Sequence, residues 1–304
     1  MYAIRARLIV IFIAIVAYAA SSLAATRIEK EWPLAGTGTV TVNTSEGSIE
    51  VVGSDRKTVH LLLTADISDF DAKFVVTYNI KPDSVAIQLE RKGSGWGFWG
   101  RMVERGPNMK FKLEVPRELT LNCDTSGGPV SASSLEGAIT LHTSGGPITI
   151  SDIAGKVDAE TSGGPIDASK IDGTASLHTS GGPISVESIS GDLRAETSGG
   201  PIRIEGAGGV VDAHTSGGGV DVTLAKGNAK GGSIESSGGG INVALDATVD
   251  LTLIAETSAG RVQNDLGAAF QGTNDRDELQ GKLNRGGATL RISTSAGGVR
   301  LTSL

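Results

Sequence analysis

The sequence predicts an all-β fold, a single-stranded right-handed parallel β-solenoid (β-helix) with rungs of about 18 residues. Three observations predict it: a motif that returns at a constant interval, apolar residues that alternate within each repeat, and glycines where the chain must bend. Repeats that cannot bury an apolar face alone are stabilised by stacking on their neighbours. The right-handed coil is expected from the general rule for connections between parallel strands.

The motif Thr-Ser-Gly-Gly returns at intervals of eighteen residues. Complete copies begin at Thr125, Thr143, Thr161, Thr179, Thr197 and Thr215. Related copies begin at Thr44 (TSEG), Ser236 (SSGG), Thr257 (TSAG) and Thr294 (TSAG). The repeat therefore extends over most of the chain, from Thr44 to the C-terminal end.

Within one repeat the apolar residues alternate with polar ones. Ile148 and Ile150 lie on one side of a first segment, and Val157 and Ala159 do the same in a second segment. This period of two is typical of β-strands. Glycines at residues 145–146 and at Gly155 separate the segments, and glycine permits the tight bends that corners require. Each repeat is thus predicted to form one turn of two short strands.

Equivalent positions of successive repeats form four apolar columns. The first column contains Val130, Ile148, Ile166, Ile184, Ile202 and Val220, and the second Leu135, Ile153, Ile171, Ile189 and Ala207. The third contains Cys123, Leu141, Ala159, Leu177, Ala195 and Ala213, and the fourth Ala132, Ile150, Ala168, Val186 and Ile204. Small residues in the third column accompany large ones in the fourth, and the reverse, as expected across a thin core of constant volume. Cys123 is accordingly expected to be buried.

The residue before each motif forms a column in which acids and histidines alternate. It contains Asp124, His142, Glu160, His178, Glu196 and His214, and Glu235 continues it. We interpret it as a structural charge ladder, because a slip by one rung would bring like charges together. A metal site of His142, Glu160 and His178 is one alternative, although the two histidines would lie roughly 9.6 Å apart. A pH sensor is the other.

Residues 1–24 have the pattern of a secretory signal peptide. Arg5 and Arg7 precede an apolar stretch at residues 8–20, and Ser22-Leu23-Ala24 supplies small residues at a cleavage site. An uncleaved membrane anchor is the alternative, although the apolar stretch is short for a membrane span.

The remaining chain is predicted to form one continuous domain with two parts. Residues 25–122 are expected to form irregular N-terminal rungs with inserted strands at 58–64, 74–80, 85–90 and 110–115, and an aromatic loop. Residues 123–304 are expected to form the regular TSGG-repeat solenoid. A separate small β-domain over the irregular part is the alternative.

Two segments interrupt the strand pattern. Residues 93–106 (GSGWGFWGRMVERG) carry Trp96, Phe98 and Trp99 between glycines, which predicts either a ligand-binding loop or a cap over the open end of the core. Residues 267–287 are polar and are expected to form a solvated surface loop. The final rung then resumes at Leu290 and is expected to end the stack without a cap, which would favour association end to end.

These features together resemble the bacterial putative-adhesin family, a family of domains of unknown function. The resemblance rests on the signal, on TSEGSIEV at residues 44–51, on Val115-Pro116 before the regular region, and on the TSGGPI rungs. It covers about residues 35–304 and implies a β-solenoid in the periplasm or at the cell surface. It carries over no catalytic residue, and a fold alone does not determine a function.

We expect a non-catalytic, adhesin-like binding module of the cell envelope that recognises a polysaccharide or a surface partner. It is expected to be exported and to need no cofactor. A formal net charge of −7 argues against a nucleic-acid partner. Membrane contact is expected only through an uncleaved signal or the aromatic loop.

Two other function classes stay open. One is a self-assembling structural scaffold of the envelope, and the other, more remote, is a polysaccharide-active enzyme. Catalysis would require a unique cluster of carboxylates. The acids here repeat with the rungs, and the His142/Ser144 pair recurs as His178/Ser180 and His214/Ser216.

Overall fold

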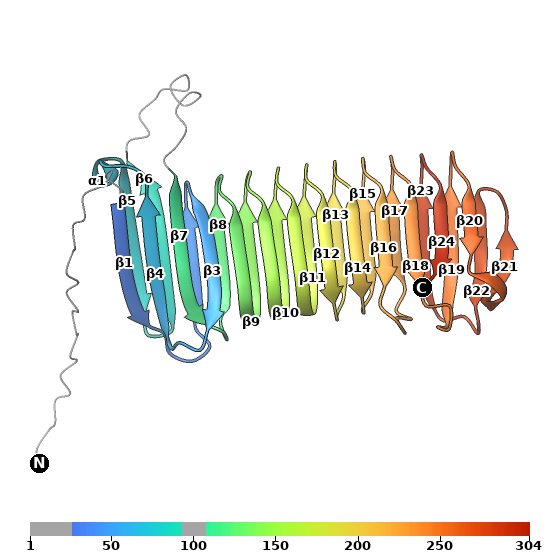
Figure 1. Cartoon of the computed structure of the whole chain (residues 1–304), viewed down its shortest axis with the longest axis horizontal. Coiled ribbons are helices and arrows are strands. Elements are labelled where there is room, and N and C mark those ends of the chain that lie inside the picture. The colour runs from blue at the N-terminus through green and yellow to red at the C-terminus, as the bar shows by residue number, and fades with distance from the viewer. Residues whose placement is uncertain (1–25, 93–107) are drawn as a thin grey trace, which may run out of the picture.

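The computed structural model describes residues 26–92 and 108–304. These residues form one elongated stack of strands (Figure 1). All described strands belong to one 24-stranded sheet, which folds into two facing walls. The predicted all-β solenoid is confirmed, whereas its right-handed coil stays a prediction.

The regular part is built from parallel strands. Ile148 of one strand pairs with Ile166 of the next, eighteen residues further along the chain. The first wall is made by the segments that follow each TSGG motif, and the second wall by the segments that precede it. The strands of this part are β8 (Thr120–Thr125), β9 (Val130–Thr143), β10 (Ile148–Thr161), β11 (Ile166–Thr179), β12 (Ile184–Ile189), β13 (Leu193–Thr197), β14 (Ile202–Ala207), β15 (Val211–Thr215), β16 (Val220–Leu224), β17 (Gly232–Ser236) and β18 (Ile241–Leu245).

The strands β9, β10 and β11 bend and contribute to both walls. In β10 the bend contains Asp152, with a φ of 57°, and Gly155, with a φ of 134°. Both angles lie in the region that favours glycine. The sequence identified the glycine at this corner but not the second left-handed residue, which is Ser134, Lys170 or Ser188 in neighbouring rungs.

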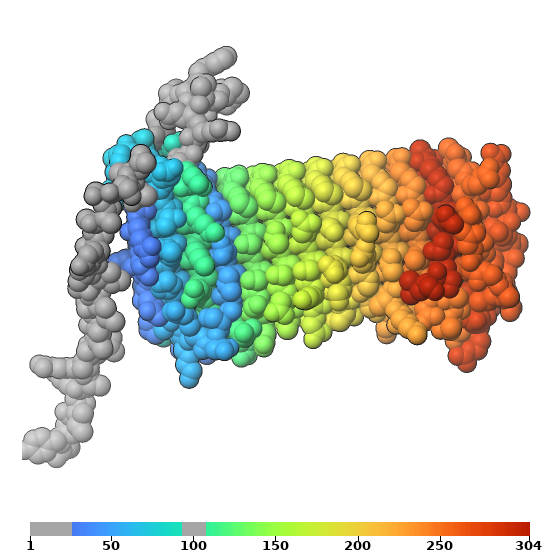
Figure 2. Space-filling model, viewed as in Figure 1, coloured from blue at the N-terminus to red at the C-terminus, as the bar shows by residue number. Residues whose placement is uncertain are grey.

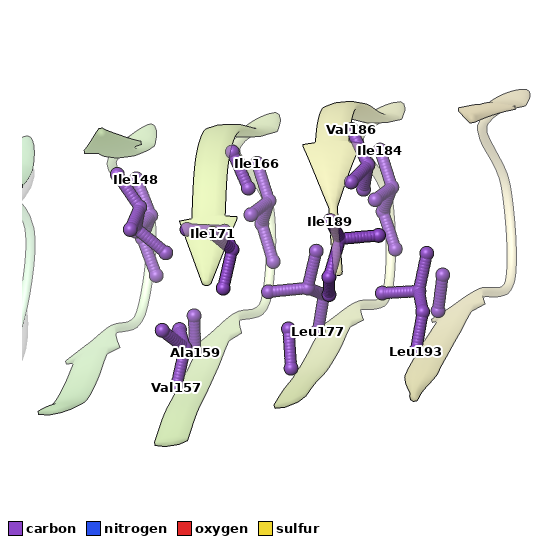
Figure 3. Packing of buried hydrophobic residues seen from close by; sticks show 14 of the residues in the cluster. Ile148, Val157, Ala159, Ile166, Ile171, Leu177, Ile184, Val186, Ile189 and Leu193 are labelled. Atoms are coloured by element: carbon purple, nitrogen blue, oxygen red, sulfur yellow. The ribbon is translucent and has the colours of Figure 1, made fainter. Parts of the chain in front are cut away.

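The four apolar columns form the core between the walls. Every residue of the predicted columns is buried, including Cys123. Figure 3 shows first-wall residues such as Ile166 and Ile184 directed toward second-wall residues such as Leu177 and Leu193. The buried apolar residues of the described chain form one cluster, which extends from Leu34 to Leu301. Consequently the irregular N-terminal strands and the regular rungs share a core.

The threonine of each motif is buried, which the sequence pattern did not reveal. The Thr161 hydroxyl donates a hydrogen bond of 2.9 Å to the Gly146 carbonyl of the preceding rung. It also accepts one of 3.3 Å from the Gly164 N–H of its own turn. A buried backbone group without a partner costs about 1–3 kcal/mol. The TSGG motif is therefore explained by the stacking of corners, without reference to a ligand.

The N-terminal part continues the stack and then closes it with antiparallel strands. β2 and β3 stack on β8 and β9, and β6 and β7 stack in parallel on β2 and β3. β5 is antiparallel to β6, β4 to β7 and β1 to β4. The elements are β1 (Thr26–Pro33), β2 (Thr39–Thr44), β3 (Ser48–Ser54), β4 (Thr58–Ala65), α1 (Phe70–Lys73), β5 (Phe74–Lys81), β6 (Ser84–Arg91) and β7 (Met109–Pro116). The four inserted strands lie where the sequence predicts them, within one or two residues at each end.

The C-terminal end corrects two expectations. The last rung of the chain is not the last rung of the stack, because β23 lies between β17 and β19, and β24 lies between β18 and β20 (Figure 1). Residues 267–287 do not form a simple surface loop: they contain two strands, and β22 pairs antiparallel with β19 and with β21. The elements are β19 (Leu251–Thr257), β20 (Val262–Asp265), η2 (Gly267–Ala269), β21 (Phe270–Asn274), β22 (Glu278–Leu283), β23 (Ala288–Thr294) and β24 (Val299–Ser303).

Figure 2 shows the resulting surface. The side chains of the regular part lie in parallel rows, and the C-terminal rung crosses this face as a dark red band flanked by orange residues. No helix in the described part of the chain is long and apolar enough to cross a membrane.

Candidate functional site

The charge ladder lies along the outer side of the second wall. The parallel register makes neighbours of Asp124 and His142, His142 and Glu160, Glu160 and His178, His178 and Glu196, Glu196 and His214, and His214 and Glu235. Each histidine approaches the acid of the following rung. The nitrogen–oxygen distances are 3.5 Å for His142–Glu160, 3.8 Å for His178–Glu196 and 3.5 Å for His214–Glu235. Asn43 and Ser293 adjoin the two ends, so neutral residues bound the alternating column.

These ladder pairs are exposed to solvent. The side chains of His142 and Glu160 are 47% and 50% exposed. Exposed ion pairs stabilise a fold by under about 1 kcal/mol, and an imidazole contributes a charge only when it is protonated. The geometry suits a column that selects the register of the rungs rather than one that supplies much stability.

The metal interpretation of the ladder stays untested. His142 and His178 flank Glu160 from opposite rungs. Among residues 26–92 and 108–304, no group of three or more His, Cys, Asp or Glu side chains is arranged to hold a metal ion.

A second feature is the N-terminal end of the stack, where β1 and β5 are the outermost strands of the two walls. Trp32 of β1 contacts Tyr78 of β5, with ring centroids 5.2 Å apart. Phe70 stacks on Phe74 at 5.5 Å. A groove of about 510 Å³ lies beside these rings and is lined mainly by apolar side chains. Sequence reasoning missed this groove, because the local patterns do not reveal that β1 pairs with β4 and β5 with β6.

The predicted ligand-binding residues Trp96, Phe98 and Trp99 lie outside the described residues. The strands on either side of them in the chain are β6 and β7, and both are described. β6 and β7 stack on β2 and β3, which are joined by residues 45–47 of the first motif copy. The segment that contains the aromatics therefore joins β6 to β7 at the place where other rungs have a short TSGG-type turn.

Cys123 gives no support to a nucleophilic site. It is a buried free cysteine. Burial raises the pKa of the Cys123 thiol far above its usual range, and the neighbouring charge of Asp124 adds to the effect. A thiol that stays protonated and enclosed is a poor nucleophile.

The comparison with protein families is decisive for the classification. The model of the family described as Toastrack DUF4097 matches residues 81–302. The chain belongs to this family. The resemblance to bacterial adhesin-like domains of unknown function is thus confirmed. The matched segment of this Toastrack chain begins at the last residue of β5 and includes the whole regular part. No curated protein matches the Toastrack chain.

Solved structures similar to this Toastrack chain are remote in sequence. One, described as a putative cell adhesion protein from Clostridium sporogenes, has 12% identity and a TM-score of 0.25, with 92% of this chain and 100% of that chain covered. A putative adhesin from Bacteroides fragilis has 12% identity and a TM-score of 0.36, with 91% and 97% covered. A putative lipid binding protein from Parabacteroides distasonis has 15% identity and a TM-score of 0.33, with 90% and 96% covered. At these values the likeness carries no argument about function.

Proposed function

We propose that this Toastrack protein is an exported, non-catalytic, adhesin-like binding module of the cell envelope that recognises a polysaccharide or a surface partner. The observation that carries the proposal is that the outer face of the second wall presents polar side chains at every rung. Beside the charge ladder runs another polar column, which contains Thr140, Asp158, Ser176, Arg194 and Asp212. A surface that offers polar groups at each rung suits a long, repeating ligand, because many weak contacts then add.

The same face is shallowly hollowed in its middle. One hollow of about 290 Å³ is lined by residues that include Lys156, Asp192 and Arg194. A second, of about 200 Å³, includes His214 and Glu235, and Asp212 lines both. Mixed donors and acceptors in shallow depressions suit a hydroxyl-rich chain better than a small apolar ligand.

We assign the aromatic segment to the same function. Trp96, Phe98 and Trp99 would stack on sugar rings or contact a surface partner, as amphipathic aromatic side chains often do at interfaces. Since the flanking strands β6 and β7 belong to the N-terminal end, this contact would lie at one end of the repeated face.

Two observations favour a binding module over the alternatives. The described acids and histidines of the ladder recur with the rungs, whereas a catalytic site needs one distinct constellation. A scaffold that polymerises needs two ends that can pair, and the described C-terminal end finishes in the antiparallel strand β21, which exposes polar residues rather than a further parallel rung.

Co-sedimentation tests this function. The purified protein is mixed with envelope polysaccharide, peptidoglycan and outer-membrane vesicles, and a Trp96→Ala/Trp99→Ala variant is measured beside it. We expect the protein to pellet with at least one fraction and the variant to lose most of that binding. A Gln271→Ala/Thr273→Ala variant, altered on exposed positions of β21, should pellet like the unmodified protein.

Other outcomes of the co-sedimentation assay would favour one of the other two function classes, a scaffold or an enzyme. Absence of pelleting with every fraction would contradict a binding module and favour a scaffold. Release of soluble sugar from the polysaccharide during incubation would point to an enzyme.

A further inference from the structure

Among residues 26–92 and 108–304, no further strand pairs with the outermost strand of either wall at the N-terminal end of the stack. Within the part of the chain that the structure describes, β1 pairs only with β4, and β5 pairs only with β6. The groove between the outermost strands is lined by Ile28, Phe70, Phe74, Val76 and Tyr78, among others. Ile28, Val76 and Tyr78 are only partly buried against the core. The core of the described residues therefore reaches their surface at this end.

Among the strands at the ends of the stack, β5 is the one that exposes large apolar side chains. It is eight residues long and carries no charge from Phe74 to Ile80. Val75 and Ile80 are 40% and 38% exposed, unusual values for large apolar residues of the described chain. Native edge strands are usually short, charged or covered, because unpaired backbone groups invite pairing with another strand.

The other edge strands are protected. β1 carries Arg27, Glu29, Lys30 and Glu31, and Glu29 is paired with His60 of β4. β21 exposes Gln271, Gly272, Thr273 and Asn274, and charged residues 275–278 follow it. β20 is only four residues long and ends at Asp265. The two ends of the solenoid are thus chemically different.

We propose that two copies of this chain join head to head through β5, paired antiparallel about a twofold axis at Tyr78. This register places Val76 opposite Ile80 of the partner subunit on the core side. It places Val75 opposite Lys81 of the partner subunit on the outer side. A register centred on Thr77 would instead set Lys73 against Lys81 of the partner subunit, and like charges directly opposite each other are destabilising.

The twofold pairing joins the two open core ends. It completes the backbone hydrogen bonding of β5 and brings the apolar sides of two grooves together. The contact is isologous, so it consumes the same surface on both copies and closes. Because the C-terminal end offers a short and polar edge, the product is a dimer and not a filament. The proposal is independent of what the repeated face binds.

Sedimentation equilibrium of the protein, expressed as the full chain, tests the dimer over a range of concentrations. We expect a monomer–dimer equilibrium. Val75→Lys places a lysine opposite Lys81 of the partner subunit, and it should weaken the dimer at least about tenfold. Gln271→Lys adds the same charge on the exposed edge strand of the other end and should leave the dissociation constant unchanged. Circular dichroism of both variants verifies that each one folds.

A cysteine variant tests the register directly. Tyr78→Cys puts two thiols at the twofold axis, so mild oxidation should give a disulfide-linked dimer. Gln271→Cys should not crosslink under the same conditions. A monomer at every concentration would overturn the proposal. The groove would then have to be occupied by residues 93–107 or by another protein. Larger assemblies, or a dimer that Gln271→Lys breaks and Val75→Lys does not, would also overturn it.

Discussion

A Gly146→Ala variant is expected to lose more than about 4 kcal/mol of unfolding free energy, which is exceptional for a single substitution. A Cβ at Gly146 would lie 2.1 Å from the Gly128 carbonyl oxygen, 2.4 Å from the Gly128 carbonyl carbon and 2.7 Å from the Pro129 nitrogen. These atoms belong to the backbone of the preceding rung and cannot rotate away. The overlap can be removed only if the corner at Gly146 moves away from the corner at Gly128 in the preceding rung.

Separation of the corners would break several contacts at once. The Thr143 hydroxyl donates to the Gly128 carbonyl at 3.0 Å, and the Val130 N–H donates to the Pro147 carbonyl at 3.0 Å. The loss should appear as a lower urea midpoint by circular dichroism. The neighbouring Gly145 supplies the matched control, because a Cβ there meets nothing within 4 Å. Equal losses for Gly145→Ala and Gly146→Ala would refute the close-approach explanation.

A Leu177→Ala variant is expected to lose about 2–5 kcal/mol of unfolding free energy. Leu177 is buried, and its register neighbours in the same column are Ala159 and Ala195. Those two side chains are too short to fill the space that the leucine leaves, so a cavity should persist between the walls. Thermal and urea unfolding measure the loss.

Leu304→Ala is the control variant for Leu177→Ala. Its side chain is 57% exposed, so Leu304→Ala should change the unfolding free energy by less than about 0.5 kcal/mol. A Leu177→Ala variant as stable as the unmodified protein would mean that the third column does not pack across the core.

The regular part of the fold was predictable because its pattern is local and exact. Alternation of Ile148 and Ile150 with the polar Thr149 identifies an inward side, and a constant interval places equivalent side chains above one another. The charge ladder follows from the same interval, so its neighbours could be named from the sequence. The two end regions have no such interval, which is why their pairing could not be derived in the same way.

The position of the last rung could not be predicted. The TSAG copies at Thr257 and Thr294 are alike, and each satisfies the local pattern of a rung. What decides their order is long-range pairing: Ile292 lies between Ile234 and Ala255 in the sheet. Antiparallel pairing of β22 with β19 likewise depends on partners far apart in the sequence. The open groove at the N-terminal end was missed for the same reason.

We infer that the rungs are interchangeable units, each set by one interval of eighteen residues. Deletion of residues 148–183 removes two of them and joins Pro147 to Ile184, which recreates the TSGGPI sequence. It also brings His142 beside Glu196, so the alternation of the ladder is kept. A deletion of residues 148–165 alone would set His142 beside His178 and should cost further stability, though under about 1 kcal/mol.

Small-angle X-ray scattering of the two-rung deletion at low concentration tests whether the rungs are interchangeable. We expect a folded protein whose longest dimension is shorter by roughly 9.6 Å, two strand spacings of about 4.8 Å. Its unfolding should stay cooperative by circular dichroism. An unfolded or aggregated product, or a folded one of unchanged length, would show that the rungs are not interchangeable.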